Sequence, residues 1–207
     1  MRRLLLTYKN EIIVPDVPEI PIDNNKIYYT STNDSTVTPY STSAFNTTIS
    51  SNSKDSSTGK FIYEFADEVT TVGENAFRSR STLQTIQLPN TVTSIGSRAF
   101  YYCSGLTEID CGSGLETIAA SAFSTCDSLT TVRLGNSITS VGQYAFYGCS
   151  NLTSVYCGST VPPTGAYSMF ESVGETCKIY VPMDSVDAYK AAKYWSGYAD
   201  MITGYQF

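Results

Sequence analysis

The sequence predicts an α/β-type solenoid, in which short coils of similar sequence stack on one another. The first observation is a pattern that recurs every 23 residues between Leu83 and Cys157. A repeat of this length cannot bury its own apolar stripe and must pack on its neighbours. The second observation is the apolar spacing of Leu83, Ile86 and Leu88 at the start of a copy, which fits a short strand. Stacked copies would therefore form a parallel sheet.

Four features define the repeat: a leucine, an apolar residue three places later, an Ala-Phe pair in the second half, and a cysteine. They are Leu83, Leu106, Leu129 and Leu152; Ile86, Ile109, Val132 and Val155; Phe77, Phe100, Phe123 and Phe146; and Cys103, Cys126 and Cys149. The phenylalanines are expected to form a continuous column inside the solenoid. Gly96 and Gly142 precede the Ala-Phe pair at a predicted sharp turn, and either positive φ or small size explains them, because Ala119 occupies the same place.

One copy is complete enough to suggest a family. Residues 83–103 have the sequence Leu-Gln-Thr-Ile-Gln-Leu-Pro-Asn-Thr-Val-Thr-Ser-Ile-Gly-Ser-Arg-Ala-Phe-Tyr-Tyr-Cys. This segment resembles the unit of the BspA-like leucine-rich repeats, which is roughly Leu-x-x-Ile-x-Ile-Pro-x-x-Val-x-x-Ile-Gly-x-x-Ala-Phe-x-x-Cys. The resemblance implies a leucine-rich repeat array with a parallel sheet, a role in surface adhesion or host interaction, and an extracellular or cell-surface location.

Four segments are expected along the chain. They are an extended, proline-containing arm or linker (1–25), an N-terminal cap with short strands (26–65), the leucine-rich repeats (66–177), and a C-terminal capping strand and helix (178–207). Pro15, Pro18 and Pro21 stand three apart, which favours an extended polyproline-like arm over a helix. The arm is interpreted either as a spacer that joins a preceding module or as a strap along the first strands.

The β-rich N-terminal cap is expected to cover one open end of the solenoid core, because terminal repeats need an atypical outer face. Lys26–Thr30 and Thr36–Thr38 are predicted to form a hairpin. The polar residues 50–59 are predicted to be a solvated loop, and Lys60–Phe65 a strand.

The C-terminal strand-helix cap is expected to close the other end. Lys178–Pro182 is predicted to be a strand. A helix is predicted to follow from Asp184 or Ser185 to about Trp195, because apolar residues recur on one face of it.

Composition excludes several classes of function. The net charge of −6 argues against a nucleic-acid partner, because a phosphate-binding surface needs clustered lysine and arginine. The chain contains no histidine, which excludes Ser-His-Asp and Cys-His catalysis and histidine-based zinc sites. We therefore expect no enzyme activity, no metal and no cofactor.

Membrane and export signals are also weak. No segment approaches the ~18 consecutive apolar residues of a membrane span, so no membrane insertion is expected. The N-terminus begins like a signal peptide, but only Leu4–Leu6 are apolar before polar residues return, and no signal peptide is predicted.

The six cysteines are predicted to be free thiols buried as small apolar groups. Three of them repeat at the solenoid period, where neighbouring Cβ vectors would run parallel and not converge as a disulfide requires. No Cys-x-x-Cys spacing suggests zinc. Cys177 is expected to be the exposed one.

Candidate partner-binding residues follow from the strand geometry. In each strand, the residues that flank the second apolar position project from the concave face of the sheet into solvent. They are Thr85, Gln87, Glu108, Asp110, Thr131, Arg133, Ser154 and Tyr156. Repeat proteins bind partners on extended surfaces of this kind, and a merely solvated sheet is the alternative. Glu108 and Asp110 are not expected to act as a glycosidase pair, because that chemistry needs a substrate cleft between the carboxyl groups.

The sequence thus predicts a non-enzymatic binding protein whose concave surface takes a protein or glycan ligand. A second candidate surface consists of the tyrosines around the Ala-Phe segments, because tyrosine gives rigid contact area at low entropic cost. These residues are Tyr101, Tyr102, Tyr144 and Tyr147. The alternative function is that of a structural spacer or phage-associated module with no ligand of its own.

Overall fold

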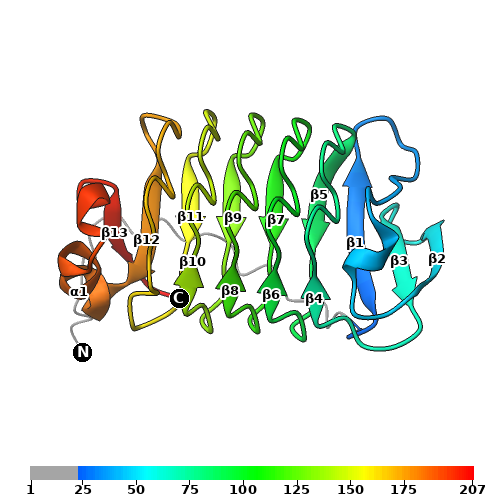
Figure 1. The fold of residues 1–207 in the computed structure, drawn as a ribbon, viewed down its shortest axis with the longest axis horizontal. Helices are drawn as coiled ribbons and strands as arrows, with labels where there is room; N and C mark the ends of the chain where they lie inside the picture. Colours follow the sequence, from blue (N-terminus) through cyan, green and yellow to red (C-terminus); the bar gives the residue numbers. More distant parts are fainter. Residues whose placement is uncertain (1–22) are drawn as a thin grey trace, which may run out of the picture.

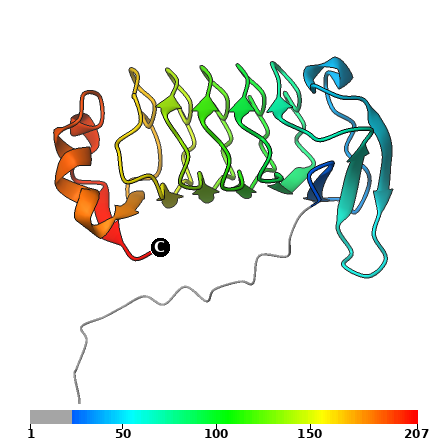
Figure 2. The same cartoon turned by 90° about the horizontal axis from the view of Figure 1, so that it is seen from below.

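The computed structural model describes residues 23–207 and shows a solenoid whose coils lie between two caps (Figure 1). Seen at right angles, the coils form one regular row (Figure 2). The predictions of a proline-containing arm and of no signal peptide concern residues 1–22, which lie outside the described part.

A nine-stranded sheet runs the length of the molecule, in the order β13-β12-β11-β9-β7-β5-β1-β3-β2. Its strands are β1 (Lys26–Ser31), β2 (Ile49–Lys54), β3 (Phe61–Phe65), β5 (Leu83–Gln87), β7 (Glu108–Asp110), β9 (Thr131–Arg133), β11 (Ser154–Tyr156), β12 (Lys178–Pro182) and β13 (Ile202–Tyr205). From β5 to β13 every neighbouring pair is parallel. The predicted parallel sheet is therefore confirmed, and only the N-terminal cap pairs antiparallel.

A second, four-stranded parallel sheet forms another side of the coils, in the order β10-β8-β6-β4. Its two-residue strands are β4 (Thr71–Val72), β6 (Ser94–Ile95), β8 (Thr117–Ile118) and β10 (Ser140–Val141). Each coil runs from the large sheet to the small sheet and returns through turns that carry the Ala-Phe pair. Between residues 66 and 177, all of which the structure describes, no α-helix occurs.

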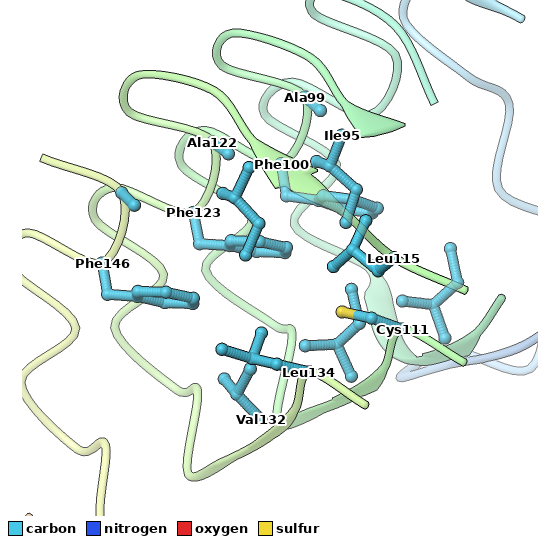
Figure 3. Close-up of a cluster of buried hydrophobic side chains, with 14 of the residues drawn as sticks. Ile95, Ala99, Phe100, Cys111, Leu115, Ala122, Phe123, Val132, Leu134 and Phe146 are labelled. Atoms are coloured by element: carbon cyan, nitrogen blue, oxygen red, sulfur yellow. The ribbon is translucent and has the colours of Figure 1, made fainter. Parts of the chain in front are cut away.

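The phenylalanine column is present and forms the centre of the core (Figure 3). Ring centroids lie 5.2 Å apart between Phe77 and Phe100, 5.0 Å between Phe100 and Phe123, and 5.1 Å between Phe123 and Phe146. The column continues to Phe170, whose ring lies 5.1 Å from Phe146. That last coil is one residue longer than the others at this point, and the structure absorbs the extra residue without disturbing the stack.

Side chains of the coils add hydrogen bonds that also repeat with the period. The Thr107 hydroxyl donates to the Gln84 carbonyl at 3.1 Å, and the Thr130 hydroxyl donates to the Thr107 carbonyl at 2.9 Å. The Cys103 thiol donates to the Phe77 carbonyl at 2.9 Å, and the later thiols of the column do the same one and two coils further on. The backbone of each coil is thus tied to the one before it.

The turns show why glycine occurs at Gly96. This residue does not have a positive φ, so the first of the two predicted reasons is wrong. A Cβ at Gly96 would lie 2.6 Å from the Glu74 amide nitrogen of the preceding coil, and the requirement is therefore small size. The positive φ angles belong to other residues of the turn, 55° at Arg98 and 59° at Tyr102.

The N-terminal cap differs from its predicted hairpin. β1 pairs antiparallel with β3 and β5, and Thr36–Thr38 is not a strand. The Val37 amide donates to the Tyr29 hydroxyl at 3.1 Å, and its carbonyl accepts a hydrogen bond from the Tyr63 hydroxyl. Because these buried side chains satisfy the backbone of Val37, the segment needs no strand partner.

The predicted loop at residues 50–59 is also partly wrong, because β2 covers its first half. β2 lies at the edge of the large sheet and pairs antiparallel with β3. An edge strand can carry polar side chains on its solvent side, so low hydrophobicity did not prevent strand formation here. One of these polar groups is used inside: the Asn52 Oδ1 accepts a hydrogen bond from the Tyr29 hydroxyl at 2.6 Å.

The C-terminal cap has the predicted strand but a shorter helix. The described chain has three 3-10 helices and one α-helix. In the C-terminal cap these are η2 (Met183–Ser185), α1 (Val186–Ala191) and η3 (Ser196–Tyr198), whereas η1 (Thr42–Ala44) belongs to the N-terminal cap. The backbone becomes extended at Ala192, with a ψ of 142°. Trp195 is thereby placed 5.9 Å from Phe170, and its indole donates to the Pro163 carbonyl at 2.7 Å. β13, which the sequence analysis did not predict, follows and extends the large sheet.

Replacing Phe123 with alanine tests the importance of the column. The ring is fully buried between two stacked neighbours, so Phe123→Ala should lower the free energy of unfolding by ~3–5 kcal/mol in urea denaturation. Tyr147→Ala removes a ring that is 39% exposed and serves as the control. It should change the free energy of unfolding by about 1 kcal/mol or less. Equal effects of the two substitutions would show that the column is not the core.

Candidate functional site

The eight predicted partner-binding residues all lie on the solvent side of the large sheet, and each is half-buried. We call this surface the outer sheet face. The parallel register places them in two rows, the first made of Thr85, Glu108, Thr131 and Ser154 and the second of Gln87, Asp110, Arg133 and Tyr156. The intervening apolar residues point inward and are buried. The structure thus brings all eight side chains together on one surface.

Both caps extend the outer sheet face. Thr30 of β1 stands beside Thr85, with 2.8 Å between their hydroxyl oxygens, and Tyr28 pairs with Gln87. At the other end, Tyr180 of β12 pairs with Tyr156. Sequence analysis restricted the face to the repeats, although strands with the same alternation were predicted in both caps.

Charged groups on the outer sheet face are paired with their neighbours. Arg133 donates to the Glu108 carboxylate of the adjacent strand, and its guanidinium lies 5.6 Å from the centre of the Tyr156 ring. The Asp110 carboxylate accepts a hydrogen bond from the Gly112 amide at 3.0 Å. Each of these side chains is therefore in contact with a neighbouring group of the chain.

Aromatic side chains gather at the C-terminal end of the face. The rings of Tyr156 and Tyr180 stack with centroids 4.8 Å apart and an angle of 13° between their planes. Tyr205 lies nearly perpendicular to both, at 5.4 and 5.6 Å, and Phe207 lies 5.1 Å from Tyr205. Partial burial, together with the neighbouring phenol of Tyr156, raises the pKa of the Tyr180 hydroxyl.

The two carboxylates of the outer sheet face have separate hydrogen-bond partners. Glu108 and Asp110 are engaged with different partners on an open sheet, so no substrate cleft separates them as glycoside hydrolysis requires. No group of histidine, cysteine, aspartate or glutamate side chains in residues 23–207 is arranged to hold a metal ion. Over the same residues, no helix has the length and apolar character needed to cross a bilayer.

The second predicted surface, on the turns, is dispersed. Tyr144 and Tyr147 pack perpendicular to each other at 5.5 Å, and they are 40% and 39% exposed. Tyr101 and Tyr102 lie on the preceding turns near the N-terminal cap, with ring centroids 6.4 Å apart. These tyrosines form two separate pairs and no continuous surface.

The cysteines are free and buried, as predicted for all except Cys177. The prediction that Cys177 is exposed is wrong: only 1% of its surface is accessible, because the last coil and its cap enclose it. Burial raises the pKa of Cys103 and of Cys177 to about 12, and it raises the pKa of Cys111 well above the ordinary value. The thiols are thus unreactive core groups.

Comparisons with known proteins give one family and one fold. A family model described as "BspA type Leucine rich repeat region" matches residues 70–189 in 6 copies. Among solved structures, a leucine-rich repeat protein of T. pallidum is 28% identical with a TM-score of 0.51, over 59% of this chain and 55% of that one. The chain therefore spans about half the length of this relative. A comparison with curated proteins found no match.

Two further solved structures are similar at lower scores. The pneumococcal vaccine antigen PcpA is 19% identical with a TM-score of 0.47, over 67% of this chain and 42% of that one. A leucine-rich cell surface protein from Faecalibacterium prausnitzii A2-165 is 17% identical with a TM-score of 0.38, over 80% of this chain and 54% of that one.

Buried thiols with raised pKa values predict that stability falls in mild alkali. The unfolded chain releases thiol protons near the ordinary pKa of about 9, whereas the folded chain keeps them, so the stabilising contribution is complete below that pH and is lost as pH rises toward 12. For each such thiol, the free energy of unfolding should fall by up to about 1.4 kcal/mol per pH unit, which is about the free energy of one pKa unit.

The variant Cys111→Leu isolates one of these thiols. The same position in the neighbouring coils holds the buried residues Leu88 and Leu134, so leucine fits the site. Urea denaturation at several pH values from 8 to 10 should give a shallower loss of stability in the variant. An unchanged slope would mean that this thiol titrates alike in the folded and unfolded chain.

Proposed function

The chain belongs to the BspA-type leucine-rich repeat family, and we propose that it is a non-enzymatic binding protein whose outer sheet face holds a protein partner. We place it at the cell surface or outside the cell, on the family resemblance. The eight half-buried residues from Thr85 to Tyr156 form the centre of the site, and Tyr180 extends it.

The observation that carries the proposal is the fixed arrangement of polar and aromatic side chains on the outer sheet face. Arg133 is held between Glu108 and Tyr156, and Tyr156 is stacked on Tyr180. Side chains that are already ordered lose little conformational entropy when a partner binds. Tyrosine and arginine are also the residue types that most often dominate binding energy at protein interfaces.

The ring orientations favour a protein over a glycan as the partner. Tyr156 and Tyr180 cover each other's faces, and Tyr205 lies perpendicular to both, so these rings offer mainly their edges and hydroxyl groups. Hydroxyl groups and ring edges suit hydrogen bonding and packing against a polypeptide. A sugar would need an open ring face on which to stack.

A binding screen tests the proposal. The chain should capture at least one protein from arrays of extracellular-matrix proteins and glycans, and the affinity for that protein should then be measured by titration. Arg133→Ala and Tyr156→Ala should each weaken it about 30-fold, as expected for residues at the centre of an interface. Lys190→Ala, on the exposed side of α1, is the control and should leave affinity unchanged.

Three results would contradict the proposal. Capture of nothing would favour the alternative, a spacer or phage-associated module without a ligand. Capture of glycans alone would leave the outer sheet face without a protein partner. A captured protein whose affinity is insensitive to both substitutions would show that another surface binds it. Circular dichroism of each variant confirms that the coils remain folded.

A further inference from the structure

A different surface, on the turns that lead from the small sheet back to the large sheet, gathers arginine and tyrosine side chains at the first two coils. We call it the arginine–tyrosine patch, and it consists of Tyr40, Arg78, Arg80, Tyr101 and Tyr102. The Arg78 guanidinium lies 5.9 Å from the Tyr40 ring centre and 5.8 Å from that of Tyr101. The Arg80 guanidinium lies 5.5 Å from the Tyr40 ring centre.

The patch is positively charged in a chain whose net charge is −6. Within residues 23–207, no carboxylate forms a salt bridge with Arg78 or Arg80, whereas Arg133 is paired. Glu74, the acidic residue of the same coil, accepts a hydrogen bond from the Asn75 side chain at 3.3 Å instead. Two positive charges are thus presented together without a counter-ion from the described chain.

Arg80 takes the place that cysteine has in the later coils, next to the N-terminal cap. Its Nε atom is buried and has no hydrogen-bond partner. The Arg80 side chain as a whole is half-buried. A partly desolvated cation without a counter-ion is unfavourable, so an anion bound at its outer edge would offset that cost.

We propose that the arginine–tyrosine patch binds an acidic sugar, meaning a sugar ring that carries a sulfate or carboxylate group. A guanidinium that lies over an aromatic ring keeps its N–H donors directed outward in its own plane, where they match the oxygens of such a group. Tyr40 lies beside both arginines and is 55% exposed. Tyr102, whose ring centre lies 6.4 Å from that of Tyr101, is 50% exposed. The Tyr102 ring gives the apolar face of the sugar a surface to pack on.

The backbone around the patch favours a sugar over an acidic peptide. The Ser79 amide donates to the Tyr101 carbonyl at 2.8 Å, and the Tyr102 amide donates to the Ser124 carbonyl at 3.0 Å. The Tyr40 amide is likewise bonded to the Ala76 carbonyl at 2.7 Å. With these amides engaged, the patch offers no strand edge to which a peptide could add its main chain. Recognition must then come from side chains alone.

Titration calorimetry with a heparin-derived hexasaccharide tests this inference. The full chain should bind the sulfated hexasaccharide, and its desulfated form should bind at least about tenfold more weakly, because the charge-assisted hydrogen bonds are lost. Arg78→Gln and Arg80→Gln should each weaken binding about tenfold. Lys190→Gln removes the same charge from the far cap and should leave the affinity unchanged.

Several outcomes would overturn the inference. The first is that the sulfated hexasaccharide does not bind, and the second is that its desulfated form binds equally well. The third is that Lys190→Gln loses as much affinity as the arginine variants, which would indicate attraction by diffuse charge. Equal affinity for a poly-glutamate peptide of matched charge would instead assign the patch to acidic polypeptides. Because Arg80 contributes to the join with the cap, circular dichroism checks its variant. If that variant does not fold, Arg78→Gln alone decides the result.

Discussion

The stacking of each coil on the one before it is the constraint on which the rest of the structure depends. A coil carries one phenylalanine ring, one or two buried leucines and a few other apolar residues, too little to form a core alone. Stacked rings at 5.0–5.2 Å and backbone hydrogen bonds between coils join these pieces into one core. The period of the sequence is therefore also the period of the core contacts from Phe77 to Phe146. The two caps are needed because a stack has two open ends.

The same constraint creates the surfaces that are available for binding. Because successive strands are parallel and in register, each side chain of the outer sheet face has a neighbour one strand away, as Glu108, Arg133 and Tyr156 do. The turns repeat in the same way, so Arg78 lies over Tyr101 of the next coil. Function can thus vary through outward residues while the inward residues keep the coils together. A protein partner on one surface and an acidic sugar on another would be compatible in a single chain.

The sequence was sufficient to predict the array, but only part of each cap. Fixed spacing predicted the parallel sheet, the Phe100 column and the placement of the candidate residues, because each copy repeats the same physical requirement. The caps occur once, and their structure depends on contacts distant in sequence, such as the tyrosine hydroxyls that satisfy the backbone of Val37. Of the arginine–tyrosine patch, only Tyr101 and Tyr102 were predicted, because the patch joins Tyr40 of the cap to residues of two coils.

Deletion of one coil tests the central claim most directly. Removal of residues 106–128 joins Gly105 to Leu129 and keeps both caps, the repeat frame and a continuous phenylalanine column. Thermal unfolding followed by circular dichroism should show a folded chain with one cooperative transition at a lower midpoint. Removal of residues 106–117, about half a coil, should prevent folding. The account would be contradicted if the full-coil deletion did not fold. It would also be contradicted if the half-coil deletion were as stable as the full-coil deletion.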